Sequence, residues 1–154
     1  MTTPLIEGLA RFTDPRNESQ LRELDELVGA LDLEDCGEPE IRALLEVFER
    51  FPDEDGHGVF WSILHCLEKC RGYEPLLLDS VARAPVEFNL NMINRLLNSG
   101  VSDLGGHRLL SILEEAATSD KASFSTRKLA RNFIEYQRGR DTRLIRDGEV
   151  PFVR

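Results

Sequence analysis

The chain has 154 residues, of which 41% are apolar, and carries a formal net charge of −9. This length suits one domain of ordinary size that buries roughly 70% of the surface exposed by its unfolded chain. Because no apolar run approaches the roughly 20 residues that span a bilayer, and the first residues lack the basic start and long apolar block of a secretory signal, we predict a cytoplasmic protein without membrane partners.

The negative charge is concentrated in the first third of the chain. Residues 1–56 hold 16 acidic and 5 basic side chains, whereas residues 57–154 hold 12 acidic and 14 basic ones. An acidic surface repels nucleic acid and anionic lipid, which excludes both as direct partners. Alternatively, the acidic surface only keeps the protein soluble.

Apolar residues recur at spacings of three and four along most of the chain, which predicts about eight helices. We expect them over residues 4–12, 18–33, 39–51, 59–71, 73–84, 87–98, 103–117 and 123–138. The residues from Gly139 onward show no clear period, so 139–154 is predicted to be a less regular tail of a single helical domain spanning 1–154.

No segment alternates apolar and polar residues over the length of a strand, and the predicted fold class is therefore all-α. The segments 38–71, 73–99 and 103–138 each form a pair of predicted helices. Stacked helical hairpins of this length are typical of HEAT-like α-solenoids. The pairs share no repeated consensus, so an irregular helical bundle is the rival architecture.

The predicted helix over Val59–Leu67 contains only two polar residues, Ser62 and His65. A helix that is apolar on nearly every side belongs in the middle of a core. The preceding loop is its opposite, because Asp53, Glu54 and Asp55 stand between Pro52 and Gly58 and must face water. A buried helix is therefore expected to carry an acidic loop.

The three cysteines are an odd and small number, which favours thiols over disulfides and indicates a reducing compartment. Cys66 and Cys70 lie on one helical stripe without the second ligand pair that zinc sites show, so we interpret both as core residues. The acidic loop fails the EF-hand pattern because Phe51 and Ser62 stand where calcium ligands are required. No metal and no cofactor is predicted.

Catalytic motifs are also missing from the sequence. The three histidines have no partner in a nucleophile-elbow context, and Gly105-Gly106 is a turn signal without a phosphate-binding motif around it. We therefore predict that the protein is not an enzyme.

Recognition of another protein is the remaining interpretation. Aromatic anchors beside charges that steer a partner commonly build an interface, and Trp61 adjoins the acidic loop, although a helix of this kind favours a core position for it. The candidate contact residues are Glu38, Glu46, Glu49, Asp53, Glu54, Asp55, His57 and Trp61.

Two further polar surfaces are open to more than one interpretation. Asn91, Asn94 and Asn98 share one face of a predicted helix, which is either a contact surface or simply solvated. The basic residues between Arg127 and Arg146 can bind an acidic partner or fold back onto the acidic first third.

The segments FERFPDEDGHGVFWSILHCLE and YEPLLLDSVARAPVEFNLNMINRLLNSG, within residues 44–100, resemble small all-helical immunity proteins of bacterial polymorphic toxin systems, including contact-dependent growth inhibition. The resemblance implies a cytoplasmic antidote that binds a cognate toxin domain, often a nuclease, and blocks its active site. Since nucleases must attract a polyanion, an acidic inhibitor can be steered to them. The alternative is a HEAT-like adaptor for another protein. The oligomeric state is not predicted.

Overall fold

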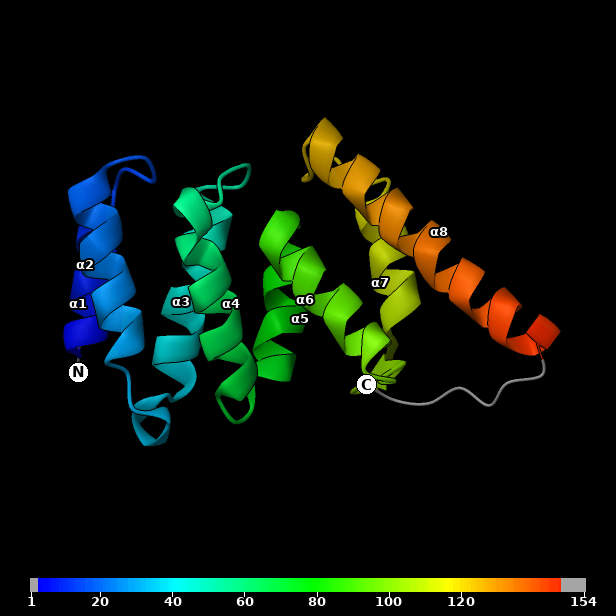
Figure 1. Ribbon diagram of the computed structural model, residues 1–154, viewed down its shortest axis with the longest axis horizontal. Helices are drawn as coiled ribbons and strands as arrows, with labels where there is room; N and C mark the ends of the chain where they lie inside the picture. Colours follow the sequence, from blue (N-terminus) through cyan, green and yellow to red (C-terminus); the bar gives the residue numbers. More distant parts are fainter. Residues whose placement is uncertain (1–2, 148–154) are drawn as a thin grey trace. The chain divides into compact units, whose positions relative to one another are not determined.

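The protein is described by a computed structural model that covers residues 3–147, with side chains placed for residues 3–140 (Figure 1). In that range the chain forms eight α-helices: α1 (Pro4–Arg11), α2 (Glu18–Gly29), α3 (Glu38–Arg50), α4 (Val59–Lys69), α5 (Tyr73–Arg83), α6 (Glu87–Asn98), α7 (Leu109–Ala116) and α8 (Phe124–Asp147). The shorter elements are the 3-10 helices η1 (Leu33–Asp35) and η2 (Gly56–Gly58) and the strands β1 (Asp103–Leu104) and β2 (His107–Arg108). The all-α prediction is confirmed.

The chain divides into two compact units, residues 1–80 and residues 81–154. The first unit holds 19 acidic and 7 basic residues and the second holds 9 and 12, so the acidity predicted for the first third is a property of the first unit. The single domain over residues 1–154 stays a prediction.

In the first unit, α1 packs on α2 and α3, and α4 packs on α2 and α3. The core between these four helices is apolar and closed: Leu9, Leu24, Leu44, Phe48 and Phe60 are each at most 1% exposed. Burial of such a side chain stabilises the fold by about 1.5–3 kcal/mol. Two helical pairs, α3 with α4 and α7 with α8, were expected from the sequence and do pack together.

The helix α4 is not buried on every side, which corrects the expectation for Val59–Leu67. Its buried residues are Phe60, Ile63, Leu64, Cys66 and Leu67. On the remaining face Trp61 is 39% exposed, and His65 is exposed one turn later. Two neighbouring helices cover only part of a helix surface, so one stripe of α4 stays open to solvent.

The helix α2 ends at Gly29, four residues before the predicted end at Leu33. A new element begins there because the Asp32 carboxylate accepts a hydrogen bond from the Glu34 amide at 3.2 Å and caps η1. Aspartate favours such local side-chain bonds over continuation of a helix. Periodicity alone extended the helix too far.

The segment predicted to begin the seventh helix at Asp103 is a short β-hairpin. Gly105 and Gly106 have φ of +53° and +82°, as the two central residues of a type I′ turn require. β1 and β2 pair antiparallel with Asp103 opposite Arg108, and α7 begins only at Leu109. The prediction of a turn at the glycine pair is confirmed, but the prediction of a helix that begins at Asp103 is wrong.

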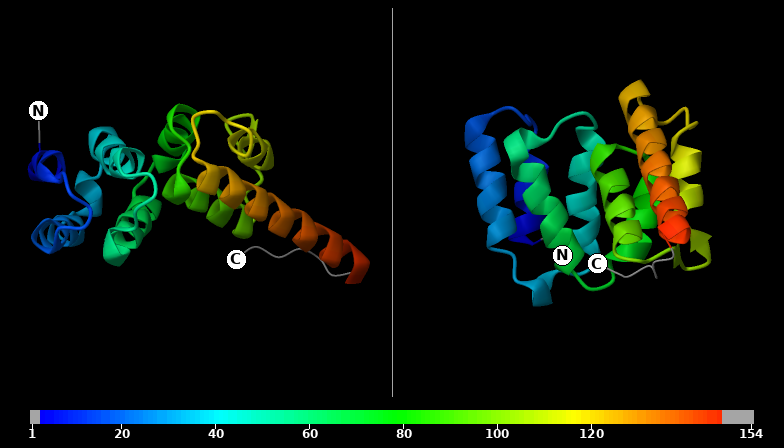
Figure 2. Two further views of the ribbon diagram at one scale, coloured as in Figure 1. Left: turned by 90° about the horizontal axis from the view of Figure 1, so that it is seen from above. Right: turned by 45° about the vertical axis from the view of Figure 1, so that its right-hand side comes forward.

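In the second unit, α6, α7 and α8 pack on one another, and α7 lies beside α8 in Figures 1 and 2. The buried stripe of α8 includes Ala130, Ile134 and Gln137, while Tyr136 is 52% exposed. The helix continues through Gly139 to Asp147. Residues 148–154 of the predicted tail lie outside the described residues.

The asparagine stripe of α6 is largely an internal contact. Gln137 donates from Nε2 to the Oδ1 atoms of Asn94 and Asn98, both at 2.8 Å, and Arg140 donates to Asn98 at 2.8 Å. Asn91 donates to the Glu87 carbonyl at 3.0 Å. The stripe therefore joins α6 to α8 instead of facing solvent, which corrects the solvated interpretation.

Cys36 and Cys70 form a disulfide, with Cα atoms 5.8 Å apart, across 34 residues of sequence. The prediction that all three cysteines are thiols is wrong for this pair, because packing brings the segment before α3 next to the end of α4. Cys66 is the free thiol of the three and is buried, as predicted. Burial raises the pKa of the Cys66 thiol, and the charge of Lys69 opposes that shift only in part.

Candidate protein-binding site

The acidic loop joins α3 to α4 and is built on a group of packed aromatic rings. Phe12 lies edge-on to Phe51 at 5.3 Å and to Phe60 at 6.3 Å between ring centroids, and Phe48 lies 5.9 Å from Phe60. We call these four residues the aromatic cluster. It fills the space below the loop, so the loop rests on a solid surface.

The loop backbone is held by local hydrogen bonds. The Asp55 carbonyl accepts from the amides of Gly58 at 3.0 Å and Phe60 at 3.2 Å, and the Asp55 carboxylate accepts from the His57 amide at 3.0 Å. Aspartate at such a position caps the helical turn that follows it. These bonds set the direction in which α4 leaves the loop.

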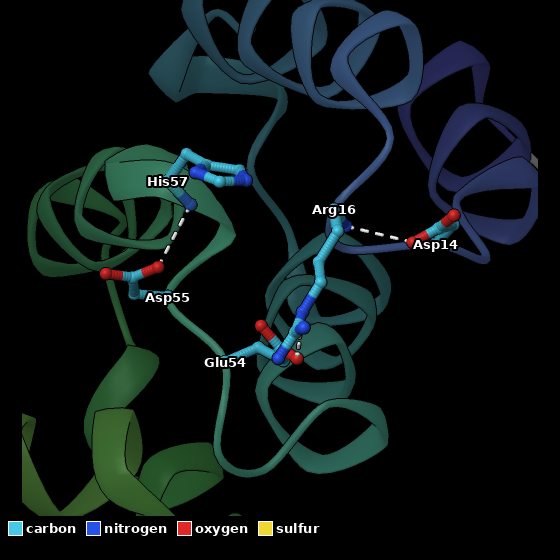
Figure 3. A network of polar contacts seen from close by, with 5 residues as sticks. All are labelled: Asp14, Arg16, Glu54, Asp55 and His57. Atoms are coloured by element: carbon cyan, nitrogen blue, oxygen red, sulfur yellow. Dashed lines mark hydrogen bonds and ion pairs between the residues drawn. The ribbon is translucent and has the colours of Figure 1, made fainter.

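A second loop, between α1 and α2, lies beside the acidic loop (Figure 3). Arg16 donates from Nε to the Glu54 carboxylate at 3.0 Å, and its own amide donates to Asp14 at 3.0 Å. Gln20 accepts from the amides of Thr13 and Asp14 at 2.8 and 2.9 Å. The two loops therefore form one ordered surface, although the pairing residues lie 38 positions apart in sequence.

The three residues of η2 have left-handed backbones, with φ of +57° at Gly56, +51° at His57 and +93° at Gly58. Gly56 allows close packing, because a Cβ atom there would lie 2.8 Å from the Phe60 ring. His57 gains no such close packing, because it is exposed. A left-handed backbone costs a non-glycine residue about 1–2 kcal/mol. Strained backbone of this kind clusters at active sites and ligand contacts, which makes His57 a candidate contact residue.

The imidazole of His57 points away from the Asp55 carboxylate (Figure 3). Further along, Trp61 and His65 follow each other on the open face of α4, with ring centroids 6.3 Å apart. His65 lies 3.8 Å from the Glu68 carboxylate. Exposed carboxylates, an imidazole and an indole thus succeed one another from the loop into α4.

The structure brings together five of the eight candidate residues. Asp53 and Asp55 are exposed, Glu54 is half-buried against Arg16, and His57 and Trp61 follow them. We call these five residues the acidic loop surface.

The three candidate glutamates of α3 lie outside this surface. Glu38 pairs with Arg42 at 2.8 Å in the first turn of α3, about 18 Å along the helix from the loop. Glu49 is half-buried and accepts from the Ser80 hydroxyl at 2.8 Å. Glu46 is exposed on the outer face of α3.

Arg16 and Asp14 lie next to the acidic loop surface but were not recognised in the sequence. Asp14-Pro15 carries a clear signal for the end of a helix, and nothing in the spacing of Arg16 and Glu54 indicates that they meet. The pairing depends on the antiparallel packing of two helical hairpins, which one sequence without structure does not reveal.

Within residues 3–140, no group of three or more His, Cys, Asp or Glu side chains is placed to hold a metal ion. Among the described helices, none is both long and apolar enough to cross a membrane. Comparisons of the chain with models of protein families, with curated proteins and with solved structures found no match, so its function has to be argued from these residues.

Proposed function

We propose that the protein neutralises a bacterial toxin domain, of the nuclease class, by covering its active site with the acidic loop surface. The observation that carries this proposal is that two exposed carboxylates, Asp53 and Asp55, stand on an ordered loop and are followed in the first turn of α4 by Trp61, which is 39% exposed. A fixed loop loses little conformational entropy when it binds.

The charge of the first unit supports a basic partner. With 19 acidic against 7 basic residues, residues 1–80 attract a cationic surface over distances of about a Debye length, 8–10 Å at ordinary ionic strength. Nuclease active sites carry basic residues that bind phosphates, and an acidic loop competes for the same residues. Trp61 adds apolar area and a ring face for an arginine or lysine of the toxin.

The resemblance of residues 44–100 to immunity proteins of polymorphic toxin systems supports the same function, because that segment contains the whole acidic loop surface. An adaptor function receives less support. Its expected contact surface was the asparagine stripe, and two of those three side chains are bonded to α8.

The direct test is co-expression with the toxin domain encoded immediately upstream. Cells should survive that domain only when this protein is present, and the two proteins should co-purify. The variant Asp53→Lys/Glu54→Lys/Asp55→Lys should lower the association rate constant by about tenfold to a hundredfold at low salt, since steering by charge acts on that rate.

A matched control reverses three exposed carboxylates outside the loop, Asp25→Lys/Glu26→Lys/Glu115→Lys, with the same change in net charge. If both triple variants slow association equally, the net charge and not the loop steers the partner. Survival without this protein, or toxicity in its presence, would overturn the proposed function.

A further inference from the structure

The end of the first unit opposite the acidic loop contains a cavity of about 390 Å³. In Figure 1 the start of α1, the end of α2 and η1 lie together at the lower end of this unit, while the acidic loop lies at its upper end. The cavity walls combine the apolar side chains of Leu5, Leu27 and Leu31 with three carboxylates. We call it the α2-end cavity.

The carboxylates are those of Asp32, Asp35 and Glu40. Glu40 is only 6% exposed and accepts from the Gly37 amide at 3.0 Å, so it is a fixed part of the wall. Three carboxylates around apolar side chains create a negative potential that a cationic group relieves.

The negative end of a helix dipole adds to this potential. The cavity is lined by Ala30 and Leu31, the residues that directly follow α2, and the last turn of α2 contains no basic residue. The carbonyl end of a helix carries roughly half a negative charge and favours cations. The carboxylates and the helix end therefore point to the same kind of ligand.

Elsewhere in the molecule arginines occupy comparable positions. Arg50 donates to the carbonyls of Leu9 and Phe12 at the end of α1, at 3.0 and 2.9 Å. At the end of α7, Arg131 donates to the Ala117 carbonyl at 3.4 Å. The last turn of α2 contains no basic residue, and this helix end lines an acidic cavity instead.

The occupant that fits is a long basic side chain and not a metal ion. Within the described side chains no acidic group is arranged to hold a metal, these three included. A basic side chain instead lays its methylene groups along leucines and directs its charge to carboxylates. A guanidinium is planar and binds carboxylates in a forked geometry, which favours arginine over lysine.

A neighbouring apolar side chain indicates that the basic residue belongs to a protein. Leu33, between the cavity residue Asp32 and the exposed Glu34, is 47% exposed. Free arginine has nothing to place against this side chain, whereas a peptide segment has flanking residues that do. The Cys36–Cys70 disulfide fixes the chain directly after η1, so the acidic wall is held in position.

We propose that the α2-end cavity receives an arginine side chain presented by a partner protein, with Asp32 and Asp35 as the carboxylates that bind its guanidinium. This site does not depend on the acidic loop surface or on the toxin proposed above.

The test uses the full chain, uniformly labelled with nitrogen-15, and the tripeptide acetyl-Gly-Arg-Gly-amide followed by amide NMR shifts. The amides of Leu27, Leu31 and Asp35 should shift on titration. The same peptide with citrulline in place of arginine keeps the shape and loses the charge, and it should bind at least about tenfold more weakly, as expected for loss of a charge-assisted bond. The same peptide with lysine in place of arginine should bind with an affinity between those of the arginine and citrulline peptides.

The variant Asp32→Asn/Asp35→Asn should bind the arginine peptide about tenfold more weakly. Asparagine is as good a helix cap as aspartate, so the fold and η1 should be retained. Asp25→Asn, an exposed carboxylate of α2 outside the cavity, is the control and should bind like the unchanged protein. Equal binding of the citrulline peptide, shifts outside the cavity, or no effect of the double variant would overturn the proposal.

Failure of this experiment leaves the toxin proposal standing, because the acidic loop surface lies at the other end of the unit. Conversely, loop variants that lose toxin binding should still bind the arginine peptide as the unchanged protein does. A peptide that binds only after Cys36 and Cys70 are reduced would also contradict the proposal, since a fixed wall is part of it.

Discussion

The two ends of the first unit solve the same problem, closure of a four-helix core, in different ways. At the acidic loop the aromatic cluster fills the interior, and the charged side chains stand on its outside. At the other end a disulfide joins Cys36 to Cys70, and a cavity of about 390 Å³ remains beside it. Packed rings thus lie under the protruding loop, whereas at the hollow end the chain after η1 is held by a covalent bond.

The largest expected effect is loss of the disulfide. Replacement by Cys36→Ala/Cys70→Ala should lower the free energy of unfolding by about 3–4 kcal/mol, because the bridge closes a loop of roughly 35 residues in the unfolded chain. Urea denaturation measures this difference. Hydrogen exchange should rise at residues 32–37 and stay unchanged at residues 53–58.

The control for this variant is Cys66→Ala, which removes a buried thiol without breaking a bridge and should cost about 1 kcal/mol. If reduction of the wild-type protein left its unfolding midpoint unchanged, the covalent closure of this end would be refuted.

The tight packing below the acidic loop can be tested at Gly56. Gly56→Ala should cost about 2–3 kcal/mol, because its Cβ would lie 2.8 Å from the buried Phe60 ring and 3.1 Å from Leu21, on a left-handed backbone. Gly58→Ala meets no atom within 4 Å and should cost only the backbone strain, about 1–2 kcal/mol. Equal losses in urea denaturation would show that packing under the loop is not tight.

The comparison also explains what the sequence could predict. Helix positions followed from local apolar spacing and from Pro and Gly, and the acidic loop followed from its charge and its boundaries. Burial of α4 was overestimated because the apolar pattern of a helix does not show how many other helices pack around it. Trp61, next to Ser62, belongs to a mostly apolar run, yet its side chain is exposed.

The hollow end was not predictable for a related reason. Three cysteines permit three pairings or none, and which pair meets depends on the packing of α3 against α4. The carboxylates of the cavity come from the residue that caps η1, from η1 itself and from α3, and they line one cavity because α2 ends at Gly29. Non-local geometry of this kind leaves no periodic signal.

A smaller effect of opposite sign is expected at His57. Since its left-handed backbone is costly for a side chain, His57→Gly should raise the free energy of unfolding by about 0.5–1 kcal/mol. If His57 contacts the toxin, the same variant should bind it more weakly. A stabilised variant with unchanged affinity would remove His57 from the acidic loop surface, and a destabilised one would contradict the strain argument.

The smallest effect is expected from the ion pair between Arg16 and Glu54. Its side chains are 77% and 26% exposed, so solvent screens the attraction, and Glu54→Gln should change the free energy of unfolding by less than about 0.5 kcal/mol. Glu23→Gln, which removes an exposed pair with Arg11, is the matched control and should behave alike. A loss above 1 kcal/mol for Glu54→Gln alone, measured in urea, would mean that the ion pair and not the aromatic cluster orders the loop. The acidic end would then depend on a salt-sensitive contact, and its surface would loosen as ionic strength rises.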